Sequence, residues 1–234
     1  MEKPTNTLPE SAESAPETAT GAPVPDVVPH AGEPFAPTFR HRWKYAMADH
    51  AILRRHWRNF KEFAPGAYRS NHPTVARLAE YKAQGIRSVL CLRGAPPSAA
   101  FRIEAAACAE LGLTLWTTPL RARKAPPVEA VLRAFEIFRR IDKPFLLHCK
   151  SGADRAGFGS ALYLLHLGRP VEEAQAQLSW KHWHIRRGPT AVLDAVLDLY
   201  AQDAAQIGPE EWFATRYDPV AIQAAFERGE LAYR

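Results

Sequence analysis

The part of the chain richest in reactive side chains is the stretch 148–157, which reads HCKSGADRAG. Its cysteine, Cys149, and its arginine, Arg155, are separated by five residues. Apolar runs at 145–147 and 158–165 flank it and predict a buried strand before the stretch and a helix after it. A small-residue turn between a strand and a helix points backbone N–H groups and the positive helix end at one place. We therefore expect an anion-binding site here.

Cys149 has the surroundings expected of a nucleophile that attacks a phosphate ester. A helix N-terminus and a neighbouring arginine both favour the ionised thiolate, which is the reactive form of cysteine. The guanidinium of Arg155 matches two phosphate oxygens, which a lysine could not do. We expect His148 to orient the loop through hydrogen bonds rather than to act as a base. The residues predicted to hold the phosphate are Lys150, Ser151, Gly152, Ala153, Asp154 and Arg155.

The pattern His-Cys-x5-Arg, followed by a small residue and a glycine, resembles the signature of the cysteine-based protein tyrosine and dual-specificity phosphatases. The segments 68–73 (YRSNHP) and 85–93 (GIRSVLCLR) look like the opening of the compact bacterial and fungal members. The resemblance covers roughly residues 48–205. It implies the phosphatase fold of the dual-specificity type, a phosphocysteine intermediate, and no metal or other cofactor.

Cleavage of a phosphate ester needs a general acid that gives a proton to the leaving group, and here the sequence differs from the family pattern. The family usually draws its general acid from an Asp on a loop upstream of the signature. This chain has no acidic residue between Thr114 and Glu129, and the segment 121–127 is basic. Asp154 is the best substitute as the catalytic acid, because some subgroups place an Asp immediately before the arginine. Its alternative role is to shape the loop by pairing with a nearby arginine, and Glu129 is a poorer candidate for the acid.

Two further features bear on turnover and substrate. The family commonly has Ser or Thr after the arginine, where this chain has Ala156; either Ser151 compensates or the second chemical step is slow. Lys150 and the basic segment 121–127 favour highly anionic substrates. A lysine directly after the cysteine resembles the tensin-like phosphoinositide phosphatases. A solvated basic face is the more ordinary explanation of such charges.

Other candidate residues have ordinary explanations. Cys91 lies in a strand expected beside the Cys149 strand. One interpretation is a reversible, protective disulfide with Cys149, and the commoner one is a small buried apolar side chain. His182 and His184 do not have a usual metal-ligand spacing with Cys149, and we expect them to line the rim of the active-site cleft. We therefore predict no metal site.

The composition favours a basic folded domain in a reducing compartment. Residues 1–37 carry a net charge of −5 within a chain of +5, so the remainder carries +10, which suits an anionic substrate. Three cysteines do not make a disulfide framework, and no signal peptide is visible. No apolar stretch approaches the roughly 20 residues that span a bilayer. We predict a cytoplasmic monomer without stable membrane insertion and, since no nucleic-acid reader motif occurs, without a nucleic-acid partner.

Alternating strands and helices predict an α/β fold with a central, mostly parallel sheet flanked by helices. Strands are expected at 66–70, 86–92, 113–118 and 145–147. Helices are expected at 49–63, 73–84, 98–111, 127–141, 158–165, 171–180, 189–202, 210–215 and 219–228. We predict a disordered, acidic, proline-rich tail at 1–37, a phosphatase domain at 38–205 and a C-terminal helical extension at 206–234.

The predicted function is hydrolysis of phosphate monoesters on phosphotyrosine or dual-specificity protein substrates, through a phosphocysteine. Phosphoinositides or inositol phosphates are the alternative substrates. A catalytically weak module that binds phospho-ligands is a second alternative, motivated by the missing upstream acid and by Ala156. Sulfur transfer by a rhodanese-like loop ranks lower, because those loops are usually one residue shorter between cysteine and arginine.

Overall fold

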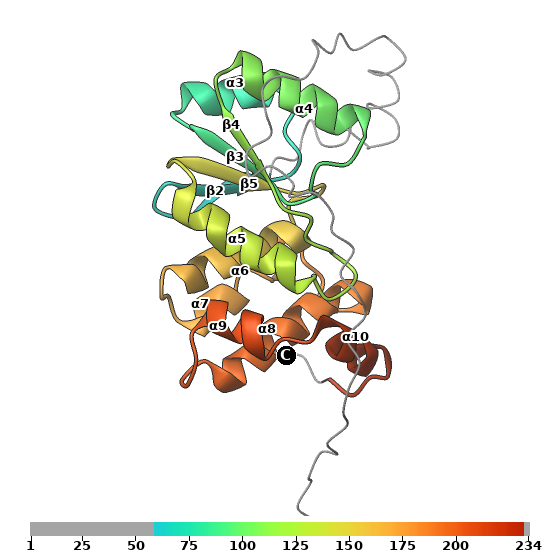
Figure 1. Ribbon diagram of the computed structural model, residues 1–234. Coiled ribbons are helices and arrows are strands. Elements are labelled where there is room, and N and C mark those ends of the chain that lie inside the picture. Colours follow the sequence, from blue (N-terminus) through green and yellow to red (C-terminus); the bar gives the residue numbers. More distant parts are fainter. Residues whose placement is uncertain (1–58, 232–234) are drawn as a thin grey trace, which may run out of the picture.

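A five-stranded sheet forms the centre of the molecule (Figure 1). The computed structural model describes residues 59–231. The strands are β1 (Lys61–Ala64), β2 (Ala67–Ser70), β3 (Ser88–Cys91), β4 (Thr114–Thr117) and β5 (Phe145–His148). Their order is β1-β2-β5-β3-β4, and within this sheet only β1 runs antiparallel to its neighbour. The predicted α/β class with a mostly parallel sheet is therefore confirmed.

The strand that precedes the reactive loop, β5, lies in the middle of the sheet. Its neighbours β2 and β3 are parallel to it, and His148 at its end is in register with Ser70 and Cys91. The carboxyl ends of three strands thus meet at one edge, which is where open parallel sheets bind ligands. Because Cys149 is the next residue after β5, the fold brings it to this edge.

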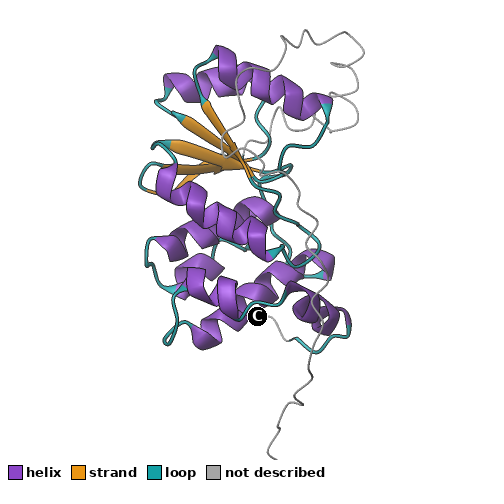
Figure 2. Ribbon diagram, viewed as in Figure 1, coloured by secondary structure: helices purple, strands orange, loops and turns teal. Residues whose placement is uncertain are grey.

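Helices cover both faces of the sheet (Figure 2). They are α3 (Val75–Ala83) and α4 (Ala99–Glu110) on one face, and α5 (Val128–Arg140) and α6 (Asp154–His166) on the other. Alternating strand side chains build the two cores: in β3, Val89 packs with α3 and α4, whereas Leu90 packs with α5 and α6. A strand buried on both faces reads as a continuous apolar run, which is why the sequence locates it.

Side chains cap the two helices of the first face. Thr74 Oγ1 accepts a hydrogen bond from the backbone N–H of Arg77, and Ser98 Oγ accepts one from Phe101. Each cap satisfies one of the N–H groups that the first helical turn leaves open. The caps fix both helices close to their predicted starts.

The last part of the chain builds a further layer of helices below α5 and α6 in Figure 1. Its elements are α7 (Val171–Gln175), α8 (Val192–Asp203), α9 (Pro209–Thr215) and α10 (Pro219–Glu227), with short 3₁₀ turns η1 (Trp180–His182) and η2 (Gly188–Ala191). Trp212 and Phe213 of α9 belong to the same core as α5 and α6. Tyr217 follows them and donates its hydroxyl to the carbonyl of Pro126 at 2.8 Å. The two helices predicted after residue 205 are present, and α9 is integral to this core.

The helix predicted at 49–63 is wrong over its last residues. Its first part lies outside the described residues, but Lys61–Ala64 forms β1, which a Pro-Gly turn joins to β2. A Pro-Gly pair favours a tight turn. The hairpin also places the ring of Phe63 edge-on against Tyr163 of α6, with 5.8 Å between the ring centroids. Turn chemistry and this contact therefore override the helical spacing.

The helix predicted at 171–180 stops halfway, at the end of α7. Beyond it, the carbonyl of Gln177 accepts a hydrogen bond from Arg69 at 3.1 Å, and that of Leu178 accepts one from Arg186 at 3.0 Å. These carbonyls bind side chains instead of continuing the helical ladder. The sequence pattern could not reveal the two arginines, because neither belongs to this segment.

The predicted tail, residues 1–37, and the predicted domain start at residue 38 lie outside the described residues. The predicted boundary after residue 205 falls in the turn between α8 and α9. Within residues 59–231, no helix combines the length and the apolar character needed to cross a membrane.

Candidate active site

Cys149 begins the loop that joins β5 to α6. Its side chain is buried, and the backbone N–H of Gly152 points at its Sγ over 3.3 Å. The helix starts at Asp154, and its N-cap residue, Ala153, makes no side-chain capping bond. The positive end of α6 therefore faces the loop without a capping side chain in the way. This is the arrangement that the predicted phosphate cradle requires.

Gly152 bends the loop back against the end of β2. Its φ is +77°, and a Cβ there would lie 2.7 Å from the backbone N of Asn71 and 2.8 Å from the carbonyl oxygen of Ser70. A side chain would clash with this backbone and would also be strained by the left-handed conformation. The loop thus requires glycine at this position.

Two side chains that the sequence did not single out hold the loop from behind. Arg69 of β2 is fully buried, and its Nη2 donates to the carbonyls of Gly152 at 2.9 Å and Ala153 at 3.1 Å. The Nδ2 of Asn59 donates to the same Gly152 carbonyl at 2.8 Å. Burial lowers the pKa of Arg69 to about 10, against the opposing effect of negative charge at Cys149 and Asp154. Arg69 therefore remains a cation at neutral pH and ties β2 to the loop.

Arg155 has an unused donor next to the loop. The residue is half-buried, and its Nε is buried without a hydrogen-bond partner in the described part of the chain. An unsatisfied buried donor costs about 1–3 kcal/mol, more when it is charged. A phosphate in the loop would satisfy it, because a guanidinium offers two parallel N–H groups to phosphate oxygens.

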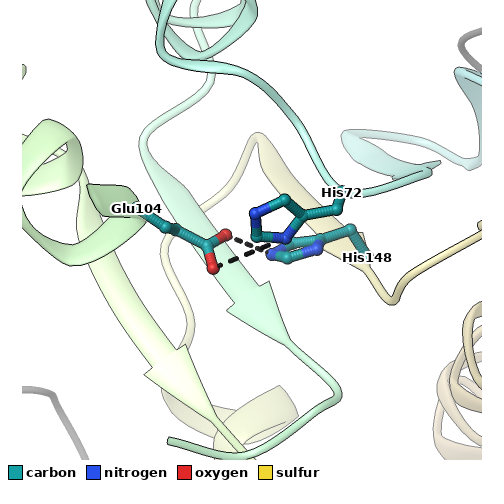
Figure 3. Close-up of side chains that lie close together, drawn as sticks. All are labelled: His72, Glu104 and His148. Carbon is teal, nitrogen blue, oxygen red and sulfur yellow. Dashed lines mark ion pairs between the residues drawn. The ribbon is translucent and has the colours of Figure 1, made fainter. Parts of the chain in front are cut away.

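A buried ion pair lies behind Cys149. Figure 3 shows the carboxylate of Glu104, on α4, turned toward the rings of His148 and His72. Glu104 Oε1 lies 2.5 Å from His148 Nε2, and Oε2 lies 3.8 Å from His72 Nδ1. Burial alone would lower the pKa of His148, but the charge of Glu104 raises it well above its ordinary value. His148 is therefore a buried cation beside Cys149, in keeping with its predicted role of supporting the loop.

The same three side chains could geometrically surround a metal ion. Their potential ligand atoms lie within 4.8 Å of one another, and all three residues are buried. Burial acts to raise the pKa of Glu104, but the charge of His148 and that of His72 lower it below its ordinary value. The ion pair accounts for their closeness without a metal. Glu104 was not identified from the sequence as a partner of the signature histidine.

Within the described part of the chain, Asp154 pairs with a histidine and not with an arginine. Its Oδ1 lies 2.8 Å from Nδ1 of His184, and Nε2 of the same ring lies 2.7 Å from Oδ2 of Asp194 on α8. Asp194 Oδ1 also lies 3.1 Å from Nε of Arg186. His184 is only 1% exposed, so the expectation that it lines the rim of the cleft is wrong. It lies beneath the loop because it bridges two carboxylates.

The other predicted loop residues differ in what their side chains do. Lys150 is exposed, and Ser151 Oγ accepts a weak hydrogen bond from the N–H of Ala153 at 3.4 Å. Ala156 is fully buried and brings no hydroxyl to the loop. The basic segment 121–127 follows β4 at the same edge of the sheet and carries exposed cations.

Cys91 and His182 flank the site without entering it. Cys91 is buried and free, as are the other two cysteines of the chain, Cys108 and Cys149. Burial raises the pKa of the Cys91 thiol. His182 is half-buried, and burial together with the charge of Arg69 lowers its pKa to about 4. His182 is therefore neutral at physiological pH.

A cavity of about 1150 Å³ lies apart from this loop, between α5 and α9. Its lining includes Thr117 and Pro119 after β4, and both acidic and basic side chains of the two helices. None of the residues of the Cys149–Arg155 loop lines it. The chemistry of the site therefore rests on the loop and not on this cavity.

A model described as the tyrosine phosphatase family matches residues 115–177, from β4 to the end of α7. The match includes the entire Cys149–Arg155 loop. It confirms the predicted resemblance to the cysteine-based tyrosine phosphatases over the segment that carries the site. Phosphatase activity is what the match supports.

Solved structures are similar to this chain. A candidate phosphatase from Shewanella putrefaciens CN-32 is 19% identical, with 62% of this chain and 90% of that chain covered and a TM-score of 0.50. The core catalytic domain of the PP-IP phosphatase SIW14 from S. cerevisiae is 16% identical, with 75% and 96% covered and a TM-score of 0.43. TpbA from P. aeruginosa is 16% identical, with 73% and 91% covered and a TM-score of 0.47. No curated protein matches the chain.

Proposed function

We propose that this protein hydrolyses phosphate monoesters through a phosphocysteine formed on Cys149. The observation that carries the proposal is the position of Arg155. Its Nε is buried with no hydrogen-bond partner among residues 59–231, and it lies in the loop that also aims the Gly152 N–H at the Cys149 sulfur. Such a loop stabilises an anion through preorganised donors. The three free cysteines support a reducing compartment such as the cytoplasm.

The reaction then has two steps. In the first, the Cys149 thiolate attacks phosphorus, the S–P bond forms, and the ester P–O bond breaks with its electron pair on the leaving oxygen. In the second, a water attacks phosphorus, the new O–P bond forms, and the S–P bond breaks to return the thiolate. Arg155 and the loop amides bind the equatorial phosphate oxygens in both steps.

The Asp154–His184 pair is the proposed source of the leaving-group proton. The pair holds one proton in the hydrogen bond between Asp154 Oδ1 and His184 Nδ1, at 2.8 Å. In the first step the leaving oxygen takes that proton through Asp154, and in the second step the attacking water returns one to the pair. The enzyme thus returns to its starting protonation state after each turnover.

The proposed substrates are phosphorylated proteins, with the enzyme acting as a phosphotyrosine or dual-specificity phosphatase. A second candidate is an inositol phosphate or phosphoinositide, which the exposed side chains of Lys150 and of the basic segment 121–127 favour at the same edge of the sheet. Phosphate release from matched panels of phosphopeptides and phosphoinositides separates the two. The preferred panel identifies the class by its higher kcat/KM.

Hydrolysis of an aryl phosphate by the full chain tests the proposal. Cys149→Ser should reduce kcat more than about 1000-fold. Arg155→Ala should reduce it by about 100-fold or more. The matched controls Cys108→Ala and Arg87→Ala, a buried cysteine and an exposed arginine away from the loop, should keep the activity.

Three outcomes would contradict the proposal. Activity that survives Cys149→Ser would remove the nucleophile. Phosphate binding without any turnover in the unsubstituted protein would favour the binding module. Sulfur transfer from thiosulfate, in place of phosphate release, would favour the rhodanese-like alternative.

A further inference from the structure

His184 connects the phosphate loop to a second carboxylate. Its Nδ1 faces Asp154 Oδ1 at 2.8 Å and its Nε2 faces Asp194 Oδ2 at 2.7 Å. Because an ionised carboxylate can only accept hydrogen bonds, both ring nitrogens carry a proton when both acids are ionised. The imidazole is then a cation fixed between two anions.

The neighbouring charges indicate that the His184 cation mainly compensates Asp154. Asp194 already has a second positive partner, since its Oδ1 lies 3.1 Å from Nε of Arg186. Asp194 is 4% exposed and His184 1% exposed, so water does little to compensate either charge. On the loop side, Arg69 is the charged group that faces Asp154 from β2, but its hydrogen bonds go to backbone carbonyls and to Gln177.

We propose that His184, held in place by Asp194, neutralises Asp154 so that the loop can accept a phosphate dianion. The inference rests on the proposed function, because it concerns the same loop. His184 and Asp194 are positioning residues, since neither touches the substrate. Without the His184 proton, Asp154 would place an uncompensated negative charge in the loop that must bind two more, and Coulomb repulsion would weaken binding.

The proposal predicts a pH dependence of phosphate binding. Burial works against protonation of His184, but the hydrogen bonds and charges of Asp154 and Asp194 raise its pKa to about 9. The charge of Asp154 is therefore compensated at neutral pH, and this compensation is lost as the pH rises through about 9 and His184 loses its proton. Arg69, with a pKa of about 10, titrates nearby, so variants must separate the two groups.

The test measures the affinity of the Cys149→Ser protein for phenyl phosphate by calorimetry. This background prevents turnover and removes the thiol as a titrating group. Because the second pKa of a phosphate monoester is about 6, the ligand stays a dianion from about pH 8 to about pH 10. We expect the affinity to fall by about tenfold or more, with a midpoint near pH 9.

Three further substitutions in this background distinguish His184 from Arg69. Asp194→Asn removes one of the two carboxylates that hold the proton, so the midpoint should move to lower pH. His184→Asn keeps a neutral donor near the Nδ1 position, and binding should already be weak at neutral pH. Adding Asp154→Asn to His184→Asn removes the uncompensated charge and should restore the affinity. A merely structural role for His184 would not produce this rescue.

Two results of the binding measurements would overturn the inference. One is a midpoint that Asp194→Asn does not move, and the other is undiminished neutral-pH binding in His184→Asn. An NMR titration of His184 in the unsubstituted protein needs no variant: protonation persisting to about pH 9 agrees with the inference, and a neutral ring at pH 8 contradicts it. Absence of phenyl phosphate binding in the Cys149→Ser parent at every pH would instead contradict the proposed function, and the inference with it.

Discussion

The Nη2 of Arg69 lies 2.9 Å from the carbonyl oxygen of Gly152, so that β2 holds the loop that follows β5. The two residues are 83 positions apart in sequence, and β2 and β5 are neighbours in the sheet. The contact explains how a loop of small residues stays ordered around the proposed anion-binding centre. Preorganisation of this kind is what makes such donors effective in catalysis.

Removing the Arg69 guanidinium should therefore loosen the loop. We expect Arg69→Met to lower the free energy of unfolding by about 2–3 kcal/mol, because buried carbonyls lose their donors. The KM for an aryl phosphate should also rise. Urea denaturation and steady-state kinetics measure both effects. Arg87→Met, at an exposed position, is the control, and equal behaviour of the two variants would argue against the clamp.

A side chain at Gly152 should damage the site more than the fold. Gly152→Ala and Gly168→Ala both place alanine at a positive φ, +77° and +69°, which costs about 1–2 kcal/mol each. Only the Gly152 position has backbone within 3 Å of the added Cβ, whereas Gly168 has nothing within 4 Å. Activity should fall by about 100-fold in Gly152→Ala alone, since the loop must move. Comparable activities in the two variants would contradict this.

The Glu104–His148 pair should contribute strongly to stability. Glu104→Gln leaves the His148 cation buried without its counter-charge, and breaking a buried pair in this way costs about 3–5 kcal/mol. Glu110→Gln, on the exposed surface of the same helix, should change stability by about 0.5 kcal/mol or less. Denaturant unfolding of the two variants at neutral pH makes the comparison. A small effect of Glu104→Gln would mean that the pair is not ionised.

The proposed proton donor can be tested through the leaving group. Asp154→Asn should slow an ester with a poor leaving group, such as phenyl phosphate, far more than an activated nitrophenyl phosphate. The reason is that only the poor leaving group needs a proton as the P–O bond breaks. Single-turnover rates for both esters measure the difference. Equal slowing of both would show that Asp154 acts on the loop rather than on the proton.

Local patterns were sufficient to predict the fold and the centre of the site. The apolar run 145–147, the small residues after Cys149 and the apolar helix that follows identify a strand, a turn and a helix by short-range chemistry alone. The structure has β5, the loop and α6 in that order. The parallel sheet follows from the alternation of such elements along the chain.

The supporting residues could not be predicted, because their roles depend on contacts between distant segments. Arg69 reads as one polar residue in a short strand, and only the pairing of β2 with β5 places it under the loop. The sequence shows His184 only as one histidine of a basic, aromatic turn. Its proposed role depends on contacts with Asp154 of α6 and Asp194 of α8. An arginine on a buried strand beside the signature strand is the one signal that could have suggested a clamp.

The most direct test of the central claim is a rapid-quench experiment that looks for phosphate on Cys149. The full chain is mixed with an aryl phosphate, quenched during the first turnover and analysed by peptide mass spectrometry. We predict a phosphorylated peptide that contains Cys149, that disappears as the reaction completes, and that is absent in Cys149→Ser. Phosphate release with no phosphocysteine at any time, or with the phosphate on another residue, would contradict the account.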